Sequence, residues 1–141
     1  MSLMSKSFPK QDIISITPDK SVFEAAKIMA TAKVGSILIL DNDKLAGIFT
    51  ERDLLNTLIA KGLDPEKTKI SEAMTKNVAT VDLNDTVDGC YQKMQAATCR
   101  HMPILENGKV IGMVTMKDIL RKIMAEIGDE NRQLKDYIFT T

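Results

Sequence analysis

The sequence predicts a mixed α/β (α+β) fold, in which two copies of one β-α-β-β-α unit pack with pseudo-two-fold symmetry. Three observations lead to this prediction. The chain repeats itself at a constant offset, each copy alternates strand-like and helix-like periodicity, and each copy ends its last strand in the same glycine-to-aspartate motif. Neither copy is expected to bury its apolar face alone, so the two should pack together.

The repeat has no gap. When the chain is aligned with itself so that Ile16 meets Val81, the whole of Ile16–Leu63 matches Val81–Gly128, and twelve positions are identical. The identical pairs are Val22/Val87, Met29/Met94, Ala32/Ala97, Ile39/Ile104, Leu40/Leu105, Asn42/Asn107, Lys44/Lys109, Gly47/Gly112, Thr50/Thr115, Asp53/Asp118, Leu55/Leu120 and Ala60/Ala125. Most of the other pairs keep their polarity, which indicates a tandem duplication.

Each copy is expected to contain three strands and two helices. The predicted strands are Ser15–Thr17, Ser36–Leu40 and Leu45–Phe49 in the first copy, and Thr80–Asp82, Met102–Leu105 and Val110–Val114 in the second. The first helix opens at Ser21 or Thr86, both good N-cap residues. Tight turns join the last two strands, and Asn107-Gly108 is a strong hairpin signal. The closing helices should end near glycines, Gly62 and Gly128.

Five segments are expected along the chain. They are an N-terminal extension (1–12), a first motif (13–66), a linker with a short helix (67–77), a second motif (78–128) and a C-terminal helix or tail (129–141). The linker helix is predicted at Ile70–Met74, and Glu130–Tyr137 is predicted to form a charged, amphipathic helix.

Composition excludes several classes of protein. The chain has 141 residues, of which 44% are hydrophobic and 27% charged, as is usual for a globular domain. Its net charge is zero and no apolar run is long enough to span a bilayer, so we expect neither a nucleic-acid nor a membrane partner. Cys90 and Cys99 form no C-x-x-C motif, and we expect two reduced thiols in a cytoplasmic protein, one on a helix and one just after it.

The two strand-to-helix corners, Gly47–Asp53 and Gly112–Asp118, carry the candidate chemistry. Thr50 is a good N-cap, and Asp53 falls in the first helical turn, where the helix dipole favours a carboxylate. This spacing is also that of a capping box, which serves only to begin a helix. A helix N-terminus is equally a ready phosphate site. The residues alone leave both alternatives open.

A doubled unit with strand-end Gly-apolar-apolar-Thr-x-x-Asp resembles the CBS domain pair, or Bateman module, of the small stand-alone bacterial and archaeal type. The resemblance covers about Ile13 to Ile127. Thr50–Leu54 resembles a Thr-Glu-Arg-Asp variant of the motif, Arg100–Ile104 resembles the Arg-His-apolar-Pro-Val run of the second motif, and Met74-Thr75 resembles the linker consensus.

The resemblance implies that each corner aspartate holds both hydroxyls of a ribose, while the threonine and nearby N–H groups meet a phosphate. It also implies two clefts between the units. The first would use Ile48, Thr50, Asp53, Val78 and Ala79, and the second would use Met113, Thr115, Asp118, Ile14, Val34, Gly35 and Ser36. At Gly35 a purine could approach the backbone closely.

Basic residues near the corners are candidate phosphate ligands. Arg100 and His101 precede the second strand of the second copy, and Arg52 and Lys117 occupy matching positions in the two corners. The alternatives are solvated Arg and Lys side chains and a neutral histidine that caps a strand end. Only the second copy has the Arg-His pair, so the two sites should differ in affinity or phosphate count, and Asp118 is the first residue to test.

The predicted function is an adenine-nucleotide-binding regulatory or sensor module for AMP, ADP, ATP or NAD(H), in which the ligand favours one arrangement of the pair. The basic pair favours a phosphate-bearing nucleotide over S-adenosylmethionine. The alternative is a ligand-free dimerisation or protein-interaction module.

We expect no catalytic residues and no metal ligands, because no nucleophile–base pair, metal cluster or P-loop is visible. A homodimer is expected through apolar helix faces, and the effector protein is unknown. The residues expected on these faces include Leu54, Leu58, Ile119 and Ile123.

Overall fold

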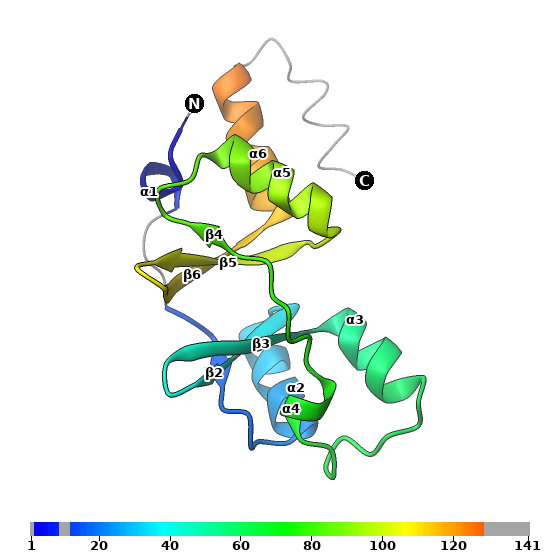
Figure 1. Ribbon diagram of the computed structural model, residues 1–141. Helices are drawn as coiled ribbons and strands as arrows, with labels where there is room; N and C mark the ends of the chain where they lie inside the picture. Colours follow the sequence, from blue (N-terminus) through cyan, green and yellow to red (C-terminus); the bar gives the residue numbers. More distant parts are fainter. Residues whose placement is uncertain (1, 9–11, 129–141) are drawn as a thin grey trace. The chain divides into compact units, whose positions relative to one another are not determined.

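The structure is a computed structural model, and it describes residues 2–8 and 12–128 (Figure 1). Within these residues the chain forms two compact units. The first-motif unit is Ile13–Val78. The second-motif unit joins residues 79–128 to the described residues that precede Ile13. Both units combine helices with a three-stranded sheet, which confirms the predicted mixed fold.

The first-motif unit has sheet order β1-β2-β3, with β2 parallel to β1 and antiparallel to β3. Its elements are β1 (Ser15–Ile16), α2 (Val22–Ala32), β2 (Ser36–Asp41), β3 (Lys44–Thr50), α3 (Glu51–Asp53), the π-helix η1 (Leu54–Ile59) and α4 (Ile70–Ala73). The predicted strands and helices are therefore present, with shifts of one or two positions at their ends.

The second-motif unit repeats this topology as β4-β5-β6. Its elements are α1 (Met4–Ser7), β4 (Val81–Asp82), α5 (Val87–Ala97), β5 (His101–Glu106), β6 (Lys109–Thr115) and α6 (Met116–Ile127). Both hairpins turn through two residues with positive φ, Asn42-Asp43 and Asn107-Gly108, as the right-handed twist of paired strands requires.

Each unit has its own core between one face of its sheet and its helices. In the first-motif unit, Ile37, Ile39 and Phe49 pack with Val22 and Met29 of α2. The corresponding core of the second-motif unit contains the sheet residues Met102, Ile104 and Val114 and the helix residues Val87, Cys90 and Met94. The alternation of buried strand residues and the spacing of buried helix residues agree with the predicted periodicities.

The segment before each motif docks on the other motif. Helix α4 packs on the first-motif unit, where the Ile70 N–H donates to Lys20 O at 2.8 Å. Helix α1 packs on the second-motif unit, where the Met4 N–H donates to Asp85 O at 2.8 Å. Lys20 and Asp85 occupy the same position in the two copies of the repeat, so the two bonds are equivalent.

Two further bonds repeat the same pattern. The Val22 N–H donates to Thr68 O, the Val87 N–H donates to Ser2 O, and both distances are 2.9 Å. The Ser2 hydroxyl also donates to the Glu126 carboxylate of α6. Residues 2–8 are thus a structural part of the second-motif unit, whereas the sequence predicted only an N-terminal extension.

The closing helices of the two units bury different residues. In the regular helix α6, Ile119 and Met124 are buried, whereas η1 buries Leu58 and leaves Leu55 and Ile59 60% and 61% exposed. Ile59 corresponds to Met124, so the wider π-helical turn rotates an apolar residue out of the core. The prediction that Leu58 and Ile119 lie on outer helix faces was therefore wrong, because both are fully buried.

The helix predicted at Glu130–Tyr137 lies outside the described residues. Among the residues that the structure does describe, no helix is long and apolar enough to cross a membrane.

Substitution of the buried Met4 should destabilise the second-motif unit. Met4 is fully buried among Val87, Cys90 and Met94, so Met4→Ala should lower the free energy of unfolding by about 2–5 kcal/mol, measured by chemical denaturation. It should also speed the labelling of the Cys90 thiol. Lys6→Ala, at an exposed position of the same helix, is the control. Equal effects of both variants would show that α1 does not stabilise this core.

Two candidate ligand-binding corners

The first corner begins the helix that follows β3. Thr50 is the N-cap, and its Oγ1 accepts the Asp53 N–H at 3.2 Å. In return, the Asp53 Oδ2 accepts the Thr50 N–H at 3.0 Å. The pair is a reciprocal capping box, one of the two alternatives that the sequence left open. Both residues are half-buried, so the carboxylate is fixed in orientation but reachable.

The second corner has the same geometry. The Thr115 Oγ1 accepts the Asp118 N–H at 3.1 Å, and the Asp118 Oδ2 accepts the Thr115 N–H at 3.2 Å. A carboxylate has about four acceptor positions, so one capping bond leaves most of them available. The capping box and a ligand role for the same aspartate are therefore compatible.

Each corner lies beside the strand entry of its own unit. Ser36 pairs with Thr50 across β2 and β3, and His101 pairs with Thr115 across β5 and β6. The backbone just before these pairs closes the corner: the Glu51 N–H donates to Gly35 O at 3.1 Å. The matching bond in the second unit joins the Met116 N–H to Arg100 O at 2.9 Å. The predicted candidates Gly35, Ser36, Arg100 and His101 are thus brought to the corners.

These bonds account for two of the donors at each helix start. The first helical N–H donates to the strand entry and the third donates to the threonine hydroxyl. The second helical N–H belongs to Arg52 in one corner and Lys117 in the other, and within the described residues it has no hydrogen-bond partner. Both residues carry a basic side chain. Each corner therefore offers one unpaired N–H and one cation.

The linker after α4 closes the edge of β3 at the first corner. Thr75 and Ile48 exchange two backbone bonds, of 2.8 and 3.0 Å. A Cβ on Gly47 would lie 2.5 Å from the Met74 sulfur and 2.8 Å from Thr75 O, so only glycine fits there. The Thr75 hydroxyl also donates to the Asp53 carboxylate. The sequence pointed to Gly47 and Met74-Thr75 separately, but did not predict this contact.

The remaining predicted site residues divide between the two units. In the first-motif unit, the Ile14 carbonyl accepts the Leu38 N–H, Val34 follows α2, and Val78 ends the linker. In the second-motif unit, Ala79 packs against the core and Met113 lies on β6. The pairing of residues from different motifs into two clefts stays a prediction.

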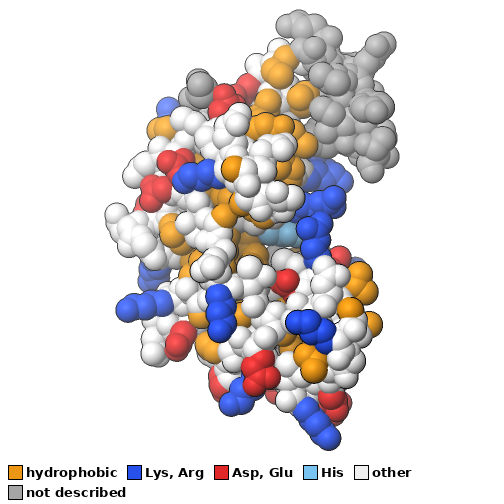
Figure 2. All heavy atoms as spheres, turned by 45° about the vertical axis from the view of Figure 1, so that its right-hand side comes forward, with side chains coloured by type: hydrophobic (Ala, Val, Ile, Leu, Met, Phe, Trp, Pro, Cys, Tyr) orange, Lys and Arg blue, Asp and Glu red, His pale blue; other side chains and the backbone are white. Residues whose placement is uncertain are grey.

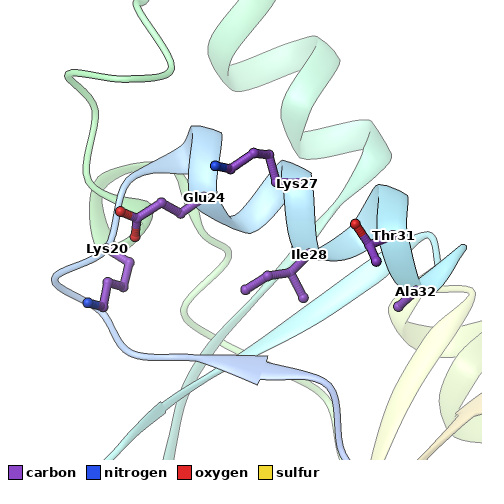
Figure 3. A pocket seen from close by; sticks show the side chains of 6 residues that line it. All are labelled: Lys20, Glu24, Lys27, Ile28, Thr31 and Ala32. Atoms are coloured by element: carbon purple, nitrogen blue, oxygen red, sulfur yellow. The ribbon is translucent and has the colours of Figure 1, made fainter.

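A cavity of about 680 Å³ lies along one side of α2 (Figure 3). Its lining comes from this helix and the segment before it: Lys20, Glu24, Lys27, Ile28, Thr31 and Ala32. None of the predicted site residues lines it. Because one helix supplies nearly the whole wall, the cavity is an open surface groove.

Neither cysteine is prepared for thiolate chemistry. Cys90 lies in α5 and Cys99 just after it, as predicted, and both are free thiols. Burial raises the pKa of the Cys90 thiol to about 11, and burial also raises the pKa of Cys99. Both thiols therefore stay protonated near neutral pH.

A profile of the family described as CBS domain matches residues 3–60 and 70–125. The chain belongs to the CBS domain family. One match falls on each copy of the repeat, which confirms the resemblance seen in the sequence. The chain is 33% identical over 127 residues to the CBS domain-containing protein CBSX3, mitochondrial, of Arabidopsis thaliana, covering 86% of this chain and 62% of that protein. It spans only about a fifth of other Arabidopsis thaliana relatives, such as CBSCBSPB2, to which it is 35% identical.

Solved CBS structures have the same fold. A putative signal-transduction protein with CBS domains from Burkholderia ambifaria is 31% identical, with a TM-score of 0.79 over 86% of this chain and 91% of that one. The CBS domain pair of protein MJ0100, in complex with 5′-methylthioadenosine and S-adenosyl-L-methionine, is 29% identical, with a TM-score of 0.78 over 89% of this chain and 98% of that one. CBS pairs are regulatory modules, and this neighbour takes adenosine-containing ligands.

Gly47→Ala should disturb the linker at the first corner. The added Cβ must displace both Met74 and the Thr75 carbonyl, and overpacking of this kind costs about 1–3 kcal/mol of stability. Gly89→Ala is the control: its Cβ would meet only the Thr86 hydroxyl, at 3.1 Å, and the equivalent residue, Glu24, already has a side chain. Thermal denaturation should therefore separate the variants, and a harmless Gly47→Ala would contradict the tight approach of the linker.

Proposed function

We propose that the chain is a regulatory module that binds an adenine nucleotide, AMP, ADP, ATP or NAD(H), at its corners. One observation carries the proposal. In both copies, the first turn of the closing helix combines a fixed carboxylate, an unpaired N–H and a basic side chain at that same position. Helix starts commonly leave an N–H to water, but a basic side chain in the first turn opposes the helix dipole, so a helix that needed only a cap would not require it.

The chemistry of these groups matches the two polar parts of a nucleotide. A carboxylate such as that of Asp118 can accept both vicinal hydroxyls of a ribose in charge-assisted bonds. The unpaired Lys117 N–H lies at the positive end of the helix dipole, which favours a phosphate. The exposed Arg100 side chain starts one position before β5, beside the same corner, and suits a bidentate phosphate contact.

The adenosine compounds in the MJ0100 complex support this class of ligand. That neighbour takes S-adenosylmethionine and methylthioadenosine, which lack phosphate. In this chain, Arg100, Lys117 and Arg52 favour a phosphate-bearing nucleotide instead. S-Adenosylmethionine is therefore the competing ligand that a binding experiment must include.

Regulation would follow from linkage. A nucleotide that binds one arrangement of the two motifs better than another shifts the equilibrium toward it, and an effector protein can read the change. No catalytic step is proposed, and the effector stays unidentified. The competing function is a ligand-free interaction module, in which the threonines and aspartates serve only as capping boxes.

We further propose that the chain forms a homodimer through the outer face of η1. Leu55 and Ile59 lie four residues apart on η1 and are exposed, and Leu63, beyond the end of the helix, is exposed as well. Hydrophobic side chains reach the surface around this helix in Figure 2. In a two-fold contact, this patch on one protomer would pack against the same patch on its partner. A symmetric dimer of this kind is the commonest assembly of identical chains.

Nucleotide binding should depend on Asp118. At a concentration 100 times the dissociation constant, AMP or ATP should stabilise the protein by about 2.7 kcal/mol, measured as a thermal shift. Asp118→Asn can still accept the Thr115 N–H but lacks the charge, so it should fold and lose at least tenfold in affinity. Asp88→Asn, in the first turn of α5, is the control.

The ligand panel contains AMP, ADP, ATP, NAD(H) and S-adenosylmethionine. Stabilisation by S-adenosylmethionine alone would overturn the preference for phosphate. Failure of every compound to shift the wild type would favour the ligand-free module. A shift that Asp118→Asn leaves intact would show instead that the nucleotide does not depend on the Asp118 corner.

Ile59→Lys should weaken the dimer. Removing an apolar side chain worth about 1.5–3 kcal/mol of burial from each partner, and adding two like charges, should make the protein monomeric at concentrations where the wild type is dimeric, measured by sedimentation velocity. Asn56→Lys adds the same charge at another exposed position of this helix. A monomeric wild type, or equal effects of both variants, would contradict the η1 interface.

A further inference from the structure

We propose that Thr75 decides which corner takes the ribose: its hydroxyl occupies the Asp53 carboxylate, so the nucleotide binds first and more tightly at Asp118. The inference rests on the proposed function and adds to it a rank order of the two sites and the residue that sets this order.

The Thr75 hydroxyl lies where a ribose would donate its hydroxyls. Its Oγ1 is 3.2 Å from the Asp53 Oδ1 and 3.3 Å from the Asp53 Oδ2. A donor almost equally distant from both oxygens occupies the bidentate position of a carboxylate, which is the position that two vicinal hydroxyls require. The Oδ2 also accepts the Thr50 N–H, so the carboxylate already receives two donors.

The backbone holds this hydroxyl in place. Thr75 exchanges two backbone bonds with Ile48, of 2.8 and 3.0 Å. The preceding helix α4 is anchored by Ile70 and Ala73, which are both buried in the core of the first-motif unit. Gly47 lets the linker lie directly against β3. The hydroxyl is therefore pre-organised and loses little entropy in its bond to Asp53.

The second corner has no equivalent hydroxyl in the sequence. Hydrogen bonds define how the two docked segments correspond, because Ser2 takes the place of Thr68 and Met4 takes the place of Ile70. In the sequence, Thr75 is the seventh residue after Thr68, and the seventh residue after Ser2 is Pro9. Proline has neither a hydroxyl nor an N–H to donate. Among the residues that the structure describes, the hydrogen bond to the Asp118 carboxylate is the capping bond from the Thr115 N–H.

The consequence is a difference in affinity between two corners that are otherwise alike. A ribose at Asp53 must displace a fixed, charge-assisted hydrogen bond, whereas a ribose at Asp118 displaces water. The net free energy of such a hydrogen bond is modest, because both groups can bond to water when it breaks. We therefore expect the Thr75 hydroxyl to weaken nucleotide binding at the first corner by about tenfold.

The test measures binding of AMP by isothermal titration calorimetry in an Asp118→Asn background, where only the first corner keeps its carboxylate. Thr75→Val has the shape of threonine without the hydroxyl, and Thr75→Ser keeps the hydroxyl. Both retain the backbone bonds to Ile48, and thermal denaturation checks that both variants fold. With ATP as a second ligand, the same series shows whether the effect is independent of the number of phosphates.

We expect Thr75→Val to tighten binding in this background by about tenfold and Thr75→Ser to leave it unchanged. No gain from Thr75→Val, or an equal gain from Thr75→Ser, would overturn the role of the hydroxyl while wild-type binding at Asp118 still upheld the proposed function. Absence of binding by the wild type and by every variant would instead overturn the proposed function itself.

Discussion

Every part of the candidate site depends on how the closing helix of each motif begins. A helix start exposes N–H donors that need partners, and here a threonine hydroxyl and a strand-entry carbonyl satisfy two of them at each corner. The aspartate in turn accepts the backbone N–H of the threonine. These bonds fix the carboxylate, and among the described residues they leave a single N–H, of Arg52 or Lys117, unpaired in the first turn. What remains after capping is one N–H, a basic side chain and the unused acceptor positions of the carboxylate, and the proposed nucleotide site is built from these groups.

The two copies use this arrangement differently. In the first-motif unit the linker lies against β3 and its Thr75 hydroxyl bonds to Asp53. The second-motif unit has a proline at the corresponding sequence position and an Arg-His pair at its strand entry. The closing helices differ as well, because η1 exposes Ile59 where α6 buries Met124. We infer that duplication produced one corner suited to ligand and one helix suited to a partner chain.

Much of the fold could be predicted because it is written in local patterns. The offset repeat, the period-two strands, the N-cap residues and the Asn-Gly turn each depend on near neighbours in the sequence, and the strands and helices predicted within the described residues are present. The exposed Leu55 and Ile59 could not be predicted, since their apolar spacing is the same as in α6 and only the π-helical turn separates them.

Contacts between segments far apart in the sequence could not be predicted either. Helix α1 docks on the second-motif unit through backbone hydrogen bonds of Ser2 and Met4. Every residue type can form such bonds, so the sequence does not reveal them. The correspondence of Leu3-Met4-Ser5 with Lys69-Ile70-Ser71 was a weak signal, because only the serine is shared. For the site, the sequence indicated Thr50, Asp53 and Thr75 one by one, but the bond between the last two needs the linker to return to β3.

The most direct measurement of the central claim is a titration of the ¹⁵N-labelled protein with AMP, observed by NMR at the backbone N–H groups of the two corners. The Lys117 N–H should shift saturably at the lowest AMP concentrations, and the Arg52 N–H should follow only at concentrations about tenfold higher. Shifts confined to residues outside both corners, or no shift at any nucleotide concentration, would contradict the claim.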